Sequence, residues 1–225
     1  VDVAVIDTGI AVSHPTLSDN VAEPGDGAHR AWEECEGDDC EQPWDDDGGH
    51  GSHVSGTVAA LEDAAGVVGV APDVTLHALK VCNGAGFCST SDIVAAVKYA
   101  ADRGWEVANL SLGAPSESPA LEDAGRYATD AGTLLVAAAG NRGPCEDCVG
   151  YPAAYDEYVA VSATSIDDSL AEFSSTGPQV DVAAPGEDVC STVPAGHETF
   201  SGTSMAAPHV AGTAAQLRAD GLDVE

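Results

Sequence analysis

Basic residues are scarce in this chain of 225 residues. Seven Lys and Arg stand against 38 Asp and Glu, which gives a formal net charge of −31. A surface of that sign repels phosphate backbones and anionic lipid headgroups. We therefore expect neither nucleic acid nor a membrane to be a partner.

Long apolar runs are also missing. The longest candidates, such as TLLVAAAG at 133–140, have the length of a strand and fall far short of the roughly 20 residues that cross a bilayer. No break in composition marks a linker, so a single domain is expected. The chain begins Val-Asp without a charged and apolar leader. Any targeting segment is expected to have been removed or to lie outside it.

The acidic residues are spread along the sequence, with a concentration in EECEGDDCEQPWDDD at 33–47. This distribution indicates a solvated acidic surface. The mutual repulsion of so many carboxylates destabilises a compact state at low salt, and the screening length falls to about 3 Å in ~1 M salt. The composition therefore predicts a halophilic protein, whose fold is most stable in concentrated salt.

The cysteines form three close pairs and one single residue, Cys190. The pairs are 35/40, 82/88 and 145/148. Short-loop disulfides in a chain otherwise poor in Cys indicate an oxidising compartment. The C-x-x-C of GPCEDC also occurs in redox and metal sites, but it has no second C-x-x-C and no suitably spaced His here, so a bridge is favoured. The spacing alone leaves the connectivity and the state of Cys190 open.

Strand-length apolar runs alternate with helical patterns along the chain. The runs lie at 1–7, 75–81, 106–112, 133–139 and 158–164, and the helical patterns at 53–62, 89–104 and 118–132. This order predicts an α/β fold with a mainly parallel sheet and helices on both faces. Ligands bind beyond the carboxyl ends of the strands in such sheets, so the chemistry is expected where strands end.

Two of these ends carry titratable side chains. Asp7 ends the first run, in VAVIDTGI, where it is either a buried carboxylate with partners or a turn residue before Thr-Gly. His50 and His53 stand three apart in GGHGSHVSGTVAA, at the start of a helical pattern. A metal site would need a third ligand, and none is apparent nearby. His50 is therefore the better candidate for a general base that meets Asp7.

Ser204 lies in SGTSMAAPHVAG, at the expected start of another helix. Serine is a preferred helix cap, and Pro208 behind it suits a first turn whose N–H groups have no acceptor. Taken alone, the motif favours a cap. Asp7, His50 and Ser204 occur, however, in the order Asp, His, Ser, which is the order of the triad in subtilisin and differs from that of chymotrypsin and the α/β-hydrolases.

Five motifs resemble those of the subtilisin-like serine proteases, in that family's order and at similar spacing. They are VIDTGI, HGSHVSGT, NLSLG, AAAGN and GTSMAAPHVAG, and the resemblance extends from Asp7 to about residue 217. It implies a three-layer subtilisin-like fold and a secreted serine endopeptidase, with 1–225 as a catalytic domain that is truncated at both ends. The acidic composition makes the chain most similar to the halolysins, the secreted haloarchaeal members.

The resemblance implies a role for each motif. Ser204 would attack the scissile carbonyl to form an acyl-enzyme, His50 would take its proton, and Asp7 would orient and stabilise the imidazole. Asn141 would donate its side-chain amide to the oxyanion beside the Ser204 backbone N–H. His53 corresponds to a second histidine of the family, which is not catalytic.

A peptide substrate would bind as an added strand between two edges of a cleft. The residues implied are Gly84, Ala85, Gly86 and Phe87 on one edge, Ser111, Leu112 and Gly113 on the other, and Ala138, Ala139, Gly140 and Gly150 around the pocket for the side chain preceding the cut. The small residues of this pocket imply a broad specificity with an apolar preference. Arg142 is expected to disfavour basic side chains there.

The resemblance also implies a structural calcium ion, with an incomplete set of ligands. Thr16 stands where many relatives carry an Asp ligand, and Asp63 is a weak candidate for another ligand. The acidic cluster at 45–47 is an alternative calcium site that stays unassigned. No cofactor is required for the chemistry.

The expected partners are protein or peptide substrates and an inhibitory propeptide in the precursor, and a monomer is expected. A second hypothesis is a catalytically incompetent subtilase-like domain that binds peptides, suggested by the truncation and the incomplete calcium site. The set of Asp7, His50, Asn141 and Ser204 favours the enzyme, because a binding domain has no need of all four. An esterase of the α/β-hydrolase class would need another residue order and a G-x-S-x-G motif.

Overall fold

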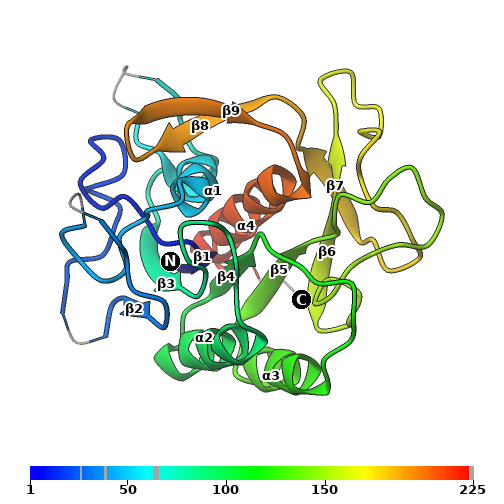
Figure 1. Cartoon of the computed structure of the whole chain (residues 1–225), viewed down its shortest axis with the longest axis horizontal. Coiled ribbons are helices and arrows are strands. Elements are labelled where there is room, and N and C mark those ends of the chain that lie inside the picture. Colours follow the sequence, from blue (N-terminus) through cyan, green and yellow to red (C-terminus); the bar gives the residue numbers. More distant parts are fainter. Residues whose placement is uncertain (26, 38–39, 63–65, 223–225) are drawn as a thin grey trace.

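A seven-stranded parallel sheet occupies the middle of the molecule in the computed structural model (Figure 1), which describes all residues except 26, 38–39, 63–65 and 223–225. The strand order is β2-β3-β1-β4-β5-β6-β7, and all of these pairings are parallel. The strands are β1 (Asp2–Asp7), β2 (Arg30–Ala31), β3 (Thr75–Lys80), β4 (Val107–Leu110), β5 (Leu134–Ala138), β6 (Tyr158–Thr164) and β7 (Val182–Pro185).

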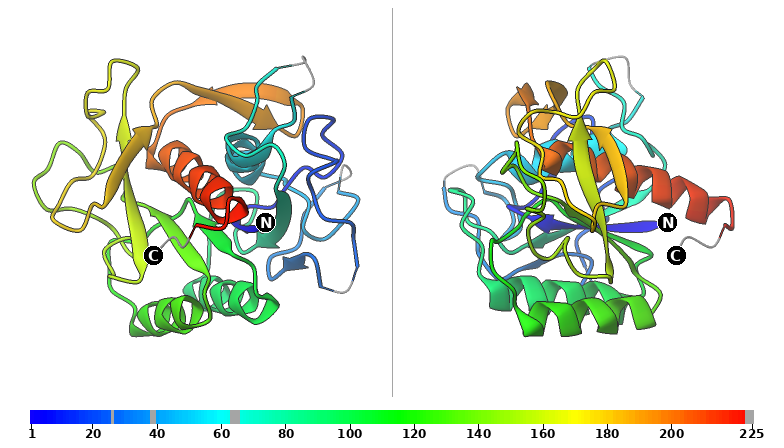
Figure 2. Two further views of the ribbon diagram at one scale, coloured as in Figure 1. Left: turned by 180° about the vertical axis from the view of Figure 1, so that it is seen from behind. Right: turned by 90° about the vertical axis from the view of Figure 1, so that its right-hand side faces the viewer.

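Helices cover both faces of this sheet (Figure 2). One face carries α1 (His50–Ala59), α4 (Thr203–Ala219) and a two-stranded antiparallel hairpin of β8 (Val189–Val193) and β9 (Gly196–Phe200). The other face carries α2 (Thr90–Arg103) and α3 (Pro119–Asp130). The α/β class and the layered architecture predicted from the sequence are confirmed.

Strand β1 shows why the sheet needs both layers. Successive side chains of a strand point to opposite faces. Val3 and Val5 belong to the core on the α1 and α4 side, and Ala4 and Ile6 to the core on the α2 and α3 side. All four are fully buried, so the strand reads as a continuous apolar run, as expected for a parallel sheet covered twice.

Helix α4 packs closely against the centre of the sheet because its residues are small. Ala206, Ala207 and Ala211 are fully buried, and a Cβ at Gly212 would lie 2.8 Å from the Cβ of Val70. The sequence placed Pro208 in the first turn of this helix, and that prediction is wrong. The helix begins at Thr203, so Pro208 lies in its interior.

The boundaries of α1 also differ from the sequence prediction of 53–62. The helix begins at His50, after Gly49 in a left-handed conformation with φ 82°, and ends at Ala59. A Cβ at Gly51 would collide with the carbonyl oxygen of Gly9, so this first turn lies directly against the backbone that follows β1. Strands β2, β7, β8 and β9 were not predicted; β2 has two residues, and the others are partly exposed.

The close cysteine pairs form the disulfides favoured by their spacing, namely Cys35–Cys40, Cys82–Cys88 and Cys145–Cys148. Cys190 is free and exposed. In the part of the chain that the structure describes, no helix is long and apolar enough to cross a membrane.

Candidate active site

Asp7 and His50 meet at the carboxyl end of β1. Asp7 is only 2% exposed, and its Oδ1 atom accepts hydrogen bonds from the Thr8 N–H at 2.7 Å and from His50 Nδ1 at 2.8 Å. A carboxylate is an acceptor, so Nδ1 carries the proton and Nε2 is left as the basic nitrogen. About a third of the His50 side chain is exposed, and the residue lines a cleft.

Asp46 fastens the start of α1, which carries His50. Its Oδ1 atom accepts hydrogen bonds from the Thr8 hydroxyl and the N–H groups of Gly48 and Gly49, and its Oδ2 atom accepts from the N–H and hydroxyl of Ser52. An anion is favourable at a helix N-terminus, where backbone N–H groups lack intrahelical partners. The sequence analysis missed this role; the available signal was an acid just before the first turn of a helix.

The carboxylates raise the basicity of His50. The negative charge of Asp7 raises the pKa of His50 above its ordinary value, against the opposing effect of burial, and the Asp7 hydrogen bond and the charge of Asp46 add to the rise. His53 differs from His50, because burial lowers its pKa to about 4. Its Nε2 atom pairs with the Val189 carbonyl at 3.0 Å, and its ring stacks on Phe200.

The opposite pKa shifts of His50 and His53 can be tested by titration. A general base works only when unprotonated, so activity is expected to fall as the pH drops through a His50 pKa above about 6.5. In the Ser204→Ala background, NMR titration should show His50 with this raised pKa, and Asp7→Asn should lower it. His53 is the internal control, with no titration between pH 5 and 8. An unchanged His50 pKa after loss of the Asp7 charge would contradict the coupling.

Ser204 lies in the first turn of α4, and a reciprocal pair of hydrogen bonds joins it to Ser111 beyond β4. The Ser204 hydroxyl donates to the Ser111 carbonyl at 3.1 Å, and the Ser111 hydroxyl donates to the Ser204 carbonyl at 2.7 Å. The Ser204 carbonyl is available because its partner in a regular helix would be the N–H of residue 208, which is proline. Asn109 supports Ser111 by donating to its hydroxyl at 2.9 Å. Among the described contacts, the Ser204 hydroxyl does not bond His50.

Asn141 follows β5 and faces the start of α4. Its Oδ1 atom accepts from the Thr203 N–H at 2.8 Å and from the Thr203 hydroxyl at 3.0 Å, which fixes the orientation of the amide. A Cβ built on Gly202 would lie 3.2 Å from Asn141 Nδ2 and 3.7 Å from the Ser204 nitrogen. Both nitrogens therefore border one small space, which the glycine leaves open.

A cleft of about 460 Å³ extends from Asp7 and His50 along the carboxyl ends of the strands. Residues 84–87 and 111–113, the two substrate edges implied by the sequence, both line it, and Phe87 is 75% exposed. The sequence analysis did not identify Ile93, Leu121 and Tyr151, which also line the cleft. Their only sequence signal is an apolar position near a helix start or after a turn.

The four residues implied for the pocket of the side chain before the cut lie together. They are not among the described residues that line the cleft. The Gly150 N–H donates to the Ala139 carbonyl at 2.8 Å, and Ala138 precedes them at the end of β5. Gly140 adopts φ 109°, and its N–H donates to the Thr203 hydroxyl at 3.0 Å. The group is thus tied to the start of α4.

Most carboxylate oxygens of the acidic cluster at 45–47 are engaged by protein donors. Both oxygens of Asp46 and of Asp47 accept hydrogen bonds from protein donors, as does the Oδ2 atom of Asp45 from the N–H groups of Glu41 and Gln42, whereas the Asp45 Oδ1 atom is buried without a hydrogen-bond partner among the described residues. The Thr16 hydroxyl bonds His14 Nδ1 at 2.9 Å. Asp63 lies outside the described residues, and within the described ones no group of three or more His, Cys, Asp or Glu is placed to hold a metal.

Comparison with known proteins extends these findings. The model of the subtilase family matches residues 1–222. Subtilisin DY of Bacillus licheniformis is 44% identical over 220 residues, which cover 96% of this chain and 76% of that protein. The intracellular serine protease of Paenibacillus polymyxa is 41% identical, over 97% of this chain and 66% of that protein. The alkaline protease of Alkalihalobacillus alcalophilus is 43% identical, over 97% of this chain and 54% of that protein. The chain thus spans between about half and three quarters of these relatives.

A solved structure agrees with these sequence relatives. The S41 psychrophilic protease superposes with a TM-score of 0.85 at 38% identity, over 98% of this chain and 77% of that one. At 38% identity the two proteins are similar in sequence as well as in fold.

Proposed function

The chain belongs to the subtilase family of serine endopeptidases, and we propose that Asp7, His50 and Ser204 form its catalytic triad, within a catalytic domain that residues 1–225 make up. The observation that carries this proposal is the 2.8 Å hydrogen bond from His50 Nδ1 to the buried Asp7 carboxylate. It sets the tautomer in which Nε2 can take a proton.

The proposed reaction uses each group in turn. The Ser204 hydroxyl leaves the Ser111 carbonyl, gives its proton to His50 Nε2 and attacks the scissile carbonyl. Asp7 stabilises the imidazolium, and the Ser204 N–H and Asn141 Nδ2 bind the oxyanion in the space beside Gly202. His50 then protonates the leaving amine, and a water activated by the same nitrogen hydrolyses the acyl-enzyme. No metal or cofactor takes part in these steps.

Substrate binding is proposed to follow the two edges of the cleft. Residues 84–87 and 111–113 both line the cleft that contains His50, and an extended peptide would bind between them as an added strand. Ala138, Ala139, Gly140 and Gly150 would bound the pocket for the side chain before the cut. Small residues there favour a broad, mainly apolar specificity.

The position of Arg142 sharpens this specificity. Its Nη2 atom donates to the Cys148 carbonyl at 2.7 Å, and a Cβ at Gly150 would lie 3.8 Å from the same nitrogen. A Lys or Arg before the cut would therefore approach a like charge. Arg142→Ala is expected to raise kcat/KM for Lys relative to Phe at that position by about 5-fold, equivalent to roughly 1 kcal/mol of repulsion in a wet pocket.

A library of peptides varied at that position measures the effect. Arg126→Ala on the exposed side of α3 is the matched control, and it should leave the preference unchanged. Preferential cleavage after Lys or Arg by the unmodified protein would contradict the assignment of Arg142.

We also propose that the protein is secreted and acts in the extracellular medium. The three disulfides support an oxidising compartment. An inhibitory propeptide in the precursor and a monomeric mature form belong to the same proposal. One similar protein is named an intracellular serine protease, so family membership alone does not decide the compartment.

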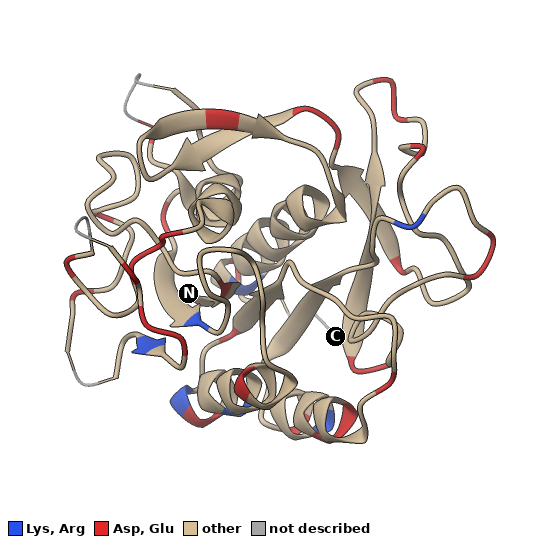
Figure 3. Ribbon diagram, viewed as in Figure 1, with Lys and Arg blue, Asp and Glu red and all other residues tan. Residues whose placement is uncertain are grey.

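A halophilic character, as in the halolysins, is proposed from the charge. Acidic residues are scattered over the loops and helices around the molecule, and basic residues are few (Figure 3). Repulsion between these carboxylates is relieved when salt screens them.

Thermal unfolding followed by circular dichroism tests this character. The melting temperature in 2 M KCl is expected to exceed that in dilute buffer, and each kcal/mol of relieved repulsion raises it by about 2–4 °C in a chain of this size. Sucrose is the control. It stabilises the folded state because it is excluded from the protein surface, and it does not screen charge. Equal melting temperatures in KCl and dilute buffer would exclude a halophilic fold.

The competing function is a catalytically incompetent domain that binds peptides. A serine-directed fluorophosphonate separates the two, because it reacts only with an activated serine. Labelling of the full-length protein in high salt is expected at Ser204 and should disappear in Ser204→Ala. A folded, salt-stabilised protein that binds peptides and takes up no label would support the binding domain.

A further inference from the structure

Lys80 is a charged residue without any exposed surface, and it lies next to the site. It is the last residue of β3, in register with Asp7 on β1, and its side chain is 0% exposed. Burying an ammonium is costly unless it is paired and fully hydrogen-bonded. Because Lys80 is not part of the solvated surface, its charge must serve the interior of the protein.

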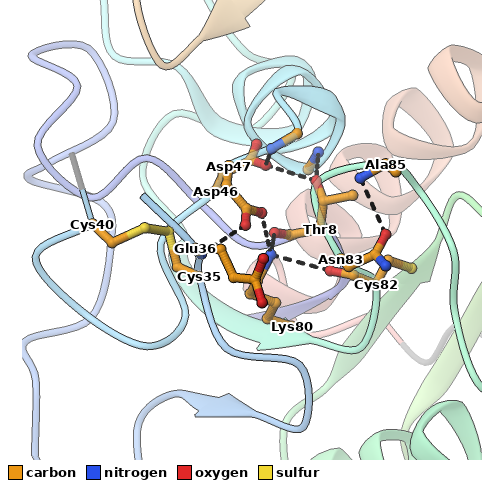
Figure 4. Close-up of polar contacts among 12 residues, drawn as sticks. Thr8, Cys35, Glu36, Cys40, Asp46, Asp47, Lys80, Cys82, Asn83 and Ala85 are labelled. Atoms are coloured by element: carbon orange, nitrogen blue, oxygen red, sulfur yellow. Dashed lines mark hydrogen bonds and ion pairs between the residues drawn. A yellow bond between two sulfur atoms is a disulfide. The ribbon is translucent and has the colours of Figure 1, made fainter. Parts of the chain in front are cut away.

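The Lys80 ammonium has three donors, and all three are used (Figure 4). It donates to the carbonyl of Thr8, to Asp47 Oδ1 at 2.6 Å and to the carbonyl of Cys82 at 3.1 Å. Burial acts to raise the pKa of Asp47, but the hydrogen bond and charge of Lys80 and the Glu36 N–H hold it below its ordinary value.

Each acceptor belongs to a different segment of the proposed active site. Thr8 follows Asp7, and its hydroxyl accepts a hydrogen bond from the Gly51 N–H in the first turn of α1. Asp47 lies three residues before His50. Cys82 opens the loop that carries cleft edge 84–87. One ammonium therefore joins the end of β1, the approach to α1 and one edge of the cleft.

Asp47 extends this connection on its other side. Its Oδ2 atom accepts from the Glu36 N–H at 2.9 Å, within the loop closed by the Cys35–Cys40 disulfide. A Cβ at Gly84 would lie 3.0 Å from the Asp47 Cγ atom, so the cleft edge rests directly on this carboxylate. Asn83 Oδ1 then accepts from the N–H groups of Ala85 and Phe87, which shapes the edge itself.

We propose that Lys80 is a positioning residue. Through its ion pair with Asp47 it fixes the placement of His50 against Asp7 and the position of the 84–87 edge of the cleft. This inference rests on the proposed protease function. It assigns Lys80 no contact with the substrate. Its effect on the reaction comes through the three segments that the ammonium holds together.

The test uses Lys80→Met, Asp47→Ala and the double variant of the full-length protein, with rates expressed per fluorophosphonate-titrated site. Misplacement of reacting groups by about 1 Å costs roughly 100-fold in rate. Each single variant is therefore expected to lower kcat/KM by about 100-fold, with a lower kcat from the displaced triad and a higher KM from the released edge. The double variant should lose no more than either single variant, because both break one connection.

Lys98→Met is the matched control, since Lys98 is an exposed lysine on α2. It should keep the unmodified kcat and KM. If Lys80→Met does not fold, Asp47→Ala decides, because Asp47 is at the margin of the cluster with 13% of its side chain exposed. Unmodified kcat and KM per titrated site, or losses that multiply in the double variant, would overturn the proposal. Absence of label in the unmodified protein would instead overturn the protease function.

Discussion

Replacing Ser204 by alanine is expected to lower kcat for peptide hydrolysis by about 10⁶-fold, the size of loss known for the triad serine of subtilisin itself. The substitution removes the attacking oxygen but leaves α4 in place. The Ser204 carbonyl would still accept the Ser111 hydroxyl, so the fold should persist. Initial rates with a chromogenic peptide in concentrated salt measure the loss.

Ser201→Ala is the matched control, because Ser201 lies three residues away on the same segment and its hydroxyl contacts Asp188. It should keep the rate of the unmodified protein. A Ser204→Ala variant with more than about a thousandth of that rate would show that another group attacks the substrate, since binding and the oxyanion site alone leave far less.

Loss of the Asn141 donor is expected to have the second-largest effect. Asn141→Leu removes one of the two groups beside Gly202 and should lower kcat by about 10²- to 10³-fold, a range known from subtilisin, with little change in KM. The cause is that the oxyanion forms only in the transition state, so the donor adds nothing to ground-state binding.

Asn141 also holds Thr203, and two further variants separate these effects. Asn141→Asp keeps an acceptor for the Thr203 N–H and removes the amide donor, so it should lose at least as much rate as Asn141→Leu. Thr203→Val removes the hydroxyl contacts with Asn141 and with the Gly140 N–H but keeps the bond from the Thr203 N–H to Asn141, and it should cost far less. The reverse ranking would make Asn141 a support for α4 and not an oxyanion donor.

The sequence named Asp7, His50, Asn141 and Ser204 as candidates, but it did not name the residues that hold them in place. Asp7 was found because strands of a doubly covered sheet read as apolar runs with polar ends, and Ser111 because NLSLG resembles a motif of the family. Lys80 was missed because its partner Thr8 is 72 residues away, and the bond from Thr8 to Asp46 likewise spans 38 residues, although Asp46 also carries the local signal of an acid before a helix. No local pattern marks such contacts.

The shifted start of α1 has a similar cause. Glycine is disfavoured inside helices by about 1 kcal/mol, so local propensity argues against a first turn that contains Gly51. Gly51 nevertheless lies in this first turn, because a side chain at its position would collide with the backbone of Gly9. Tertiary packing against the end of β1 overrides the propensity and brings His50 to Asp7.

The interior proline of α4 shows how a local irregularity serves the site. Pro208 cannot donate to the Ser204 carbonyl, which then accepts the Ser111 hydroxyl. The sequence showed the proline, but its consequence depends on β4 ending opposite the start of α4. The same bond fixes the backbone of the proposed nucleophile against the edge of the cleft.

The central claim is that Asp7, His50 and Ser204 act as one unit, and the rate of the double variant Ser204→Ala/His50→Ala tests it most directly. Groups that act only together show losses that do not multiply. We predict that the double variant retains the same residual kcat/KM as Ser204→Ala alone. A double variant that falls below it by a further factor close to the separate loss for His50→Ala would show two independent contributions and contradict the triad.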